Sequence, residues 1–125
     1  TMEIDGNIIN ITHILDPYSI DRAPDGVAAT FMTGDDCTTD NEPTYFIGHN
    51  PGVFAPVIAM EPGDTVTICD KYGDIRTYEM VDRTTIDRDT CVTPDVRETL
   101  FLDGESVSLQ ACDGSVMRVI RCKAI

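Results

Sequence analysis

Basic residues are scarce in this sequence. Lys and Arg together number 9 against 22 Asp and Glu, so the 125 residues carry a formal net charge of -13. A field of this sign repels phosphate backbones and anionic lipid surfaces, which disfavours nucleic acid as a partner. The acidic residues are scattered through turns such as 34–36 and 87–89, where their simplest role is solubility.

Long apolar segments are also missing. No run approaches the roughly 18 apolar residues that a membrane-spanning helix needs, and the first residues lack the basic, apolar and small-residue succession of a signal peptide. We therefore expect neither a span nor a signal peptide within these residues. Any membrane anchor is expected to lie outside them.

The five cysteines form no C-x-x-C pair, and their number is odd. They are Cys37, Cys69, Cys91, Cys112 and Cys122. The pattern argues against a zinc ribbon or a thioredoxin-like redox motif, and we predict no metal site and no cofactor. At least one thiol stays unpaired in a monomer, and a disulfide among the four cysteines other than Cys112 remains open. Cys69 and Cys122 lie in strand-like runs and are predicted to be buried.

The length suits one domain, residues 1–125, and the local patterns predict a β protein. Helical periodicity is weak, whereas short β-branched runs bounded by Gly, Pro, Asp or Asn recur. The predicted strands lie near 26–32, 44–48, 65–70, 75–81, 106–112 and 117–124. Residues 71–74, with Gly73, predict a hairpin turn. The stretches 5–23 and 82–105 are irregular, and each is expected to hold a short helix or a long connection.

Cys112 ends a predicted strand. Alternation puts it on the more polar face, opposite Ala111, and the turn-forming sequence Asp113-Gly114-Ser115 follows. Two hairpin registers are open. A five-residue loop would pair Cys112 with Arg118 and place both side chains on one face, whereas a tight turn centred on residues 113 and 114 would send Arg118 to the other face.

His49 is the other candidate for chemistry, since it follows an apolar strand and precedes a turn. By itself such a histidine is more often structural, and 63 positions separate it from Cys112. His13 is predicted to be structural. Arg121 competes with Arg118, but alternation from a Cys112–Arg118 pair turns Arg121 to the opposite face.

Three ordered motifs resemble the sortase family. Ile47-Gly48-His49, with the Phe-Ala-Pro and Pro-Gly-Asp elements at 54–56 and 62–64, is similar to the block around the family's catalytic histidine. Ser108-Leu109-Gln110-Ala111-Cys112 resembles its cysteine strand end, and Arg118-Val119-Ile120 resembles the arginine of its last strand. The similarity covers 44–81 and 107–124. Ala111 stands where the family usually has threonine, and the stretch between Cys112 and Arg118 is shorter than usual.

The resemblance implies an all-β, eight-stranded β-barrel with one or two short helices. It also implies a cysteine transpeptidase that cleaves an LPXTG-like sorting signal of a surface protein or pilin and transfers the acyl group to an amine acceptor, such as a cell-wall peptide or a lipid-linked precursor. Cys112 would be the nucleophile, His49 the proton-transfer partner and Arg118 the stabiliser of developing negative charge.

By the same resemblance, the protein would act at the extracellular face of the membrane, and the stretch 82–105 would shape the groove for the sorting signal. Two alternatives share these residues. One is a catalytically weak or silent sortase-like binding module, and the other is a hydrolytic cysteine peptidase that passes the acyl group to water.

Overall fold

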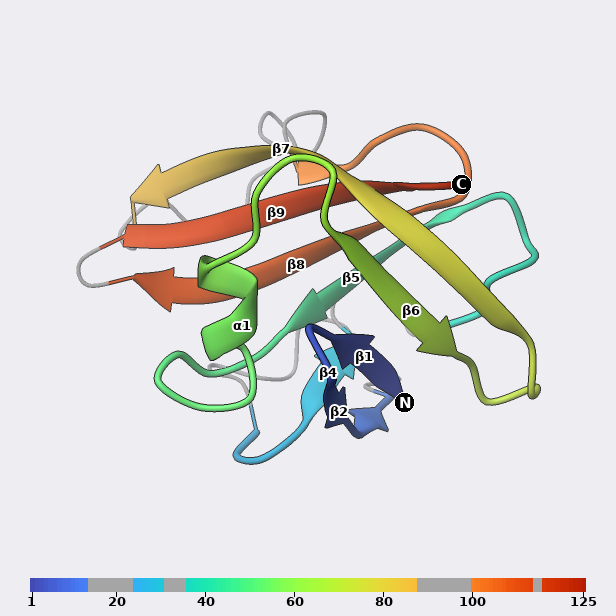
Figure 1. Cartoon of the computed structure of the whole chain (residues 1–125), viewed down its shortest axis with the longest axis horizontal. Coiled ribbons are helices and arrows are strands. Elements are labelled where there is room, and N and C mark those ends of the chain that lie inside the picture. Colours follow the sequence, from blue (N-terminus) through green and yellow to red (C-terminus); the bar gives the residue numbers. More distant parts are fainter. Residues whose placement is uncertain (14–23, 31–35, 88–99, 114–115) are drawn as a thin grey trace.

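The computed structural model describes residues 1–13, 24–30, 36–87, 100–113 and 116–125. These residues contain nine strands and one short helix (Figure 1). In chain order they are β1 (Met2–Ile4), β2 (Asn7–Ile9), β3 (Ile11–Thr12), β4 (Ala28–Thr30), β5 (Pro43–Ile47), α1 (Ala55–Ile58), β6 (Thr65–Cys69), β7 (Ile75–Asp87), β8 (Ser106–Asp113) and β9 (Val116–Ala124). No helix in these ranges is long and apolar enough to cross a membrane.

All nine strands belong to one sheet, in the order β2-β1-β6-β7-β9-β8-β5-β4-β3. The two edge strands, β2 and β3, are consecutive in the chain and separated only by Asn10. The carbonyl of Asn10 accepts a hydrogen bond from the amide of Ala28 at 2.9 Å. The sheet thus curls into a nearly closed barrel, which confirms the predicted fold class, with nine strands described where eight were expected.

Local sequence patterns located most of the strands. The six predicted strands correspond to β4, β5, β6, β7, β8 and β9, but β7 continues to Asp87, six residues beyond its predicted end. Its extension contains Thr84, Thr85 and Ile86, β-branched residues that favour strands, and it pairs with β9 throughout. The three short strands at the start of the chain were not predicted. Predictions for 14–23, 31–35, 88–99 and 114–115 lie outside the described residues.

The hairpin between β6 and β7 is confirmed. Cys69 pairs with Ile75, and Gly73 has a φ of 88°, which glycine adopts without steric cost. The carboxylate of Asp70 accepts hydrogen bonds from the amides of Tyr72 and Asp74, both at 3.0 Å. These bonds satisfy backbone donors that the turn leaves outside the ladder.

Apolar side chains gather on both faces of β5, β8 and β9. The inner cluster fills the barrel and takes Phe46 from β5, Leu109 and Ala111 from β8, and Ile120 from β9. The outer cluster lies on the opposite face and consists of Ala29, Tyr45, Ile47, Ile86, Leu100 and Val119, with Phe101 and Met117 packed against it. Ala111 therefore faces the barrel interior, on the side of β8 opposite the outer cluster.

The described cysteines, Cys37, Cys69, Cys112 and Cys122, form no disulfide with one another, and Cys91 lies outside the described residues. Cys122 is fully buried, as predicted, and burial raises its pKa to about 12. Cys69 is only half-buried, because it ends β6 at the hairpin rather than in the interior.

Candidate functional site

Cys112 lies near the end of β8, and His49 follows the end of β5, the parallel strand that pairs with β8. β5 pairs with β8 from Pro43↔Ser106 to Ile47↔Gln110, and the amide of Gly48 then donates to the carbonyl of Gln110 at 3.1 Å. If the chain kept this register for two more residues, His49 would lie opposite Cys112, with the two backbones about 4.8 Å apart. The ladder therefore brings the segments that contain these two residues, 63 positions apart in the sequence, to the same end of the two strands.

Asn50 ties the loop after His49 to the end of β8. Its side-chain amide donates to the carbonyl of Cys112 at 2.7 Å, and the carbonyl of His49 accepts from the amide of Phe54 at 2.9 Å. Both strand ends are thus held by hydrogen bonds that do not involve the imidazole or the thiol. Sequence reasoning missed Asn50, and only its position next to His49 could have drawn attention to it.

The ring of Phe54 leaves no room for a side chain at position 48. A Cβ atom at Gly48 would lie 2.6 to 2.9 Å from three atoms of the Phe54 ring, which is closer than real contacts allow. Phe54 is itself fully buried in the inner cluster, immediately before α1. The glycine before His49 therefore lets the buried ring pack directly against the backbone that leads to the histidine.

The imidazole of His49 has a carboxylate beside it. Nε2 of His49 lies 3.2 Å from Oδ1 of Asp25, with 31% of the histidine side chain and 85% of the aspartate side chain exposed. Asp25 lies just before β4, the strand on the other side of β5 from β8. Its local sequence, Pro24-Asp25-Gly26, is typical of a turn and carried no signal that linked it to His49.

The register of the β8–β9 hairpin corrects the prediction for Arg118. Cys112 pairs with Met117 and Ala111 pairs with Arg118, and the ladder closes at Asp113↔Val116. Paired residues share a face, so Arg118 lies on the side of Ala111 and Met117 on the side of Cys112. The expected Cys112–Arg118 pair is wrong, and so is the tight alternative centred on 113 and 114, because only residues 114 and 115 separate the two strands.

Arg121 also differs from its prediction. It pairs with Ser108, so it lies on the face of Cys112 rather than the opposite one, but four residues along β8, roughly 13 Å away. Its Nε and one terminal nitrogen donate to Asp82 at 2.7 and 2.6 Å. These hydrogen bonds lower the pKa of Asp82 and raise that of Arg121. Arg121 is thus committed to a bidentate ion pair between β7 and β9.

The outer cluster lies on the same face of the sheet as the side chain of Cys112. Within it, the hydroxyl of Tyr45 donates to Oε1 of Gln110 at 2.6 Å, and burial raises the pKa of Tyr45. The hydroxyl of Ser108 donates to the carbonyl of Leu100. The segment beginning at Leu100 therefore covers this face toward the start of β8, whereas Cys112 lies at its other end.

His13, which is predicted to be structural, lies beside a buried carboxylate. Its Nε2 is 3.1 Å from Oδ1 of Asp36, a carboxylate that is 2% exposed. Asp36 also accepts a hydrogen bond from the amide of Lys71, in the β6–β7 hairpin. Among the described residues, no group of three or more His, Cys, Asp or Glu is arranged to hold a metal ion.

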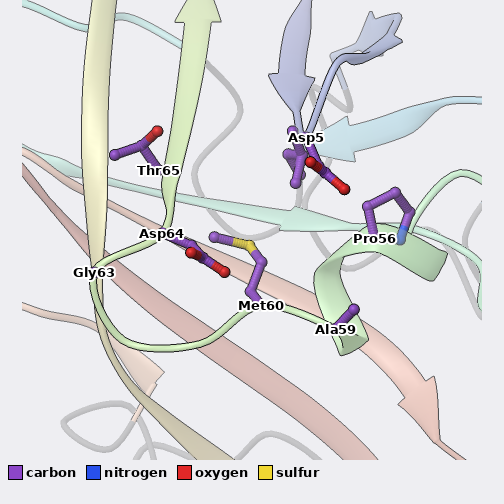
Figure 2. A pocket seen from close by; sticks show the side chains of 8 residues that line it. Asp5, Pro56, Ala59, Met60, Gly63, Asp64 and Thr65 are labelled. Carbon is purple, nitrogen blue, oxygen red and sulfur yellow. The ribbon is translucent and has the colours of Figure 1, made fainter.

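Two surface pockets lie elsewhere. One, of about 360 Å³, lies between the β1–β2 turn, α1 and the start of β6, and Figure 2 shows Asp5, Pro56, Met60 and Asp64 around it. The other, of about 400 Å³, lies at the starts of β5 and β8 and is lined by residues that include Phe101. Neither is lined by His49, Cys112 or Arg118.

Comparison with solved structures identifies the fold. Sortase C1 from Streptococcus agalactiae matches 99% of this chain over 65% of its own, with 15% sequence identity and a TM-score of 0.71. Sortase C from Clostridium perfringens SM101 matches 99% of this chain over 67% of its own, at 15% identity and a TM-score of 0.67. Sortase C-1 from Streptococcus pneumoniae matches 80% over 53%, at 14% identity and a TM-score of 0.64.

The chain has a sortase-like fold. It spans between 51% and 67% of the length of the sortase structures that it matches. No family model matches the sequence, and no curated protein matches it. The likeness therefore concerns the sortase-like barrel, and the activity has to be argued from the residues at the ends of β5 and β8.

Proposed function

We propose that this protein is a sortase-type cysteine transpeptidase that acts at the extracellular face of the membrane. It cleaves a C-terminal sorting signal of a surface protein or pilin and passes the acyl group to an amine acceptor. The observation that best supports this is the parallel register of β5 and β8 together with the hydrogen bonds from Gly48 and Asn50 to β8, because they hold the segment that contains His49 along the end of the strand that carries Cys112.

The reaction uses Cys112 and His49 in turn. The Cys112 thiolate attacks a peptide carbonyl in the sorting signal, and the C–N bond breaks as the departing amine takes a proton from His49. A thioester on Cys112 remains. The incoming amine gives its proton to His49 as it attacks the thioester, a new amide bond forms, and the thiolate leaves as it began.

Arg118 takes part in this mechanism through its positive charge, because its side chain does not start on the same face of the sheet as that of Cys112. It is half-exposed on β9, adjacent to the residue that pairs with Cys112, and its side chain starts on the face of Ala111. A guanidinium stays cationic at every relevant pH. We propose that it stabilises the negative charge that develops near Cys112 by its field from the neighbouring strand.

A second candidate function is a sortase-like module that binds sorting signals without efficient turnover. The observation that favours it is the Ala111↔Arg118 pair, which starts the arginine on the face away from the thiol. A hydrolytic peptidase would use the same residues and differ only in the acyl acceptor.

The test is cleavage of a peptide that carries an LPXTG-like signal, followed by mass spectrometry with and without an added oligoglycine amine. We expect a thioester on Cys112 and an amide product that needs the amine. Cys112→Ala should remove all turnover, whereas Cys69→Ala, which changes a half-buried thiol at the end of β6, should leave it near the wild-type level. Equal turnover in Cys112→Ala would refute the mechanism, and peptide binding without any thioester would establish the binding module instead.

A further inference from the structure

The arrangement around His49 extends across a third strand. The sheet order places β5 between β8 and β4, and β4 pairs with β5 through Ala29↔Ile47. Continuing this antiparallel register by two residues brings Val27 opposite His49, and Asp25 lies two residues before that point. His49 therefore follows a strand that lies between β8, which carries Cys112 near its end, and β4, and the carboxylate of Asp25 reaches His49 from the β4 side.

We propose that Asp25 is a positioning residue for His49 and completes an Asp25–His49–Cys112 alignment across the ends of β4, β5 and β8. The inference rests on the proposed function, since it assigns His49 the proton transfers. The contact is made by Nε2, 3.2 Å from Oδ1 of Asp25. A carboxylate only accepts hydrogen bonds when ionised, so the neutral imidazole keeps its proton on Nε2 and uses Nδ1 for proton exchange.

Asp25 acts in this arrangement by orienting the imidazole. It fixes which ring nitrogen of the neutral His49 carries the proton and which one takes part in the proton transfers. It reaches neither the thiol nor the substrate, and acts only through His49. Because 85% of its side chain is exposed, water screens the contact, and its removal should slow the reaction by about twofold to fivefold rather than abolish it.

The ring nitrogens of His49 give the first test. The chain has only two histidines, so their side-chain nitrogen signals in NMR can be assigned by one substitution. In the wild type we expect neutral His49 to be protonated on Nε2, and Asp25→Asn should shift its tautomer population while leaving the His13 signals, which report on Asp36, in place. An unchanged His49 tautomer in Asp25→Asn would overturn the proposal.

The second test follows the chemistry at Cys112. With iodoacetamide as the probe and mass spectrometry of the Cys112 peptide as the readout, Asp25→Asn should alkylate about twofold to fivefold more slowly than the wild type at neutral pH. Asp25→Glu, which keeps the carboxylate, should recover most of the rate. The matched control is Asp103→Asn, which removes the same charge from an exposed aspartate near the opposite end of β8 and should alkylate at the wild-type rate.

The two proposals fail in different ways. A tautomer shift and slower alkylation in Asp25→Asn, in a protein that never forms a thioester with a sorting signal, would leave the alignment standing and refute the transpeptidase. Normal turnover with kcat unchanged in Asp25→Asn would refute the role of Asp25 and leave the transpeptidase standing. In a competent enzyme we expect Asp25→Asn to lower kcat by about twofold to fivefold with little change in KM.

Discussion

β8 pairs with β5 on one side and with β9 on the other, and the two neighbours place different candidate residues near its end. On one side the parallel strand β5 pairs with β8 over five residue pairs and leads into the segment that contains His49. On the other side the antiparallel strand β9 returns so tightly that Arg118 falls on the opposite face. The difference teaches that one or two loop residues set the register of a hairpin, and that a shift of one residue moves every side chain of a strand to the other face.

Removing the imidazole on the β5 side should have the largest effect of four changes near the ends of these strands and along β9. His49→Ala takes away the group that protonates the departing amine, and general acid–base catalysis contributes about a hundredfold to ten-thousandfold. We expect a loss of kcat/KM in this range, measured by cleavage of the sorting-signal peptide. A loss below tenfold would show that the parallel register does not serve proton transfer.

Changing the cation on the β9 side should cost less. Arg118→Ala is expected to lower kcat/KM by about tenfold to a hundredfold, since it removes a charge near the oxyanion. Arg118→Lys keeps the charge but loses the planar donor fork, so it should stay within about threefold of the wild type if the field is what acts. Should Lys prove as damaging as Ala, the guanidinium would have to contact the substrate directly, against the face that the register gives it.

The hydrogen bond that joins the two strand ends should have a smaller effect. Asn50→Ala removes the donor to the Cys112 carbonyl, and a net hydrogen bond contributes about 0.5 to 1.5 kcal/mol. We expect the midpoint of urea unfolding to fall accordingly and kcat to fall by about threefold to tenfold. Full activity together with lowered stability would mean that the loop after His49 needs no tie to β8.

Replacing Arg121 should have the smallest effect of these changes, and it should lower only the free energy of unfolding. Arg121→Ala breaks the pair with Asp82, a partly exposed interaction that contributes at most about 1 kcal/mol, and should leave peptide cleavage unchanged. Because the arginine holds the pKa of Asp82 below its ordinary value of 3.8, this contribution is present above that value and is lost as pH falls through the lower, folded-state pKa. Urea unfolding at pH 7 and near pH 3 should therefore show a gap between variant and wild type that narrows in acid.

The sequence allowed the barrel to be predicted because alternation and turn residues are local signals. They located β5, β6, β8 and β9 within two residues, and the sortase-like motifs indicated how these strands belong together. What could not be predicted depends on contacts between distant segments. Nothing in Pro24-Asp25-Gly26 indicates that its carboxylate lies beside His49, and nothing in Asp113-Gly114-Ser115 decides between hairpin registers that differ by one residue.

The extension of β7 is another feature that local sequence patterns did not predict. Residues 82–87 are polar and contain three charges, so they were predicted to be irregular. They form a strand because β9 offers a long partner and because Asp82 is held by Arg121 at a register shift after Met80. Tertiary pairing thus overrides a weak local pattern.

The apolar clusters on both faces of β5, β8 and β9 have a consequence for exchange with solvent. Strands covered on both sides open only when much of the barrel opens with them, so their amides should be among the last to take up deuterium, whereas the two-to-three-residue edge strands β2 and β3 should exchange early. Cys112 is thereby carried at the end of the most slowly exchanging strands. Any adjustment to a substrate would come from the segments around this slowly exchanging centre, while the thiol keeps its place.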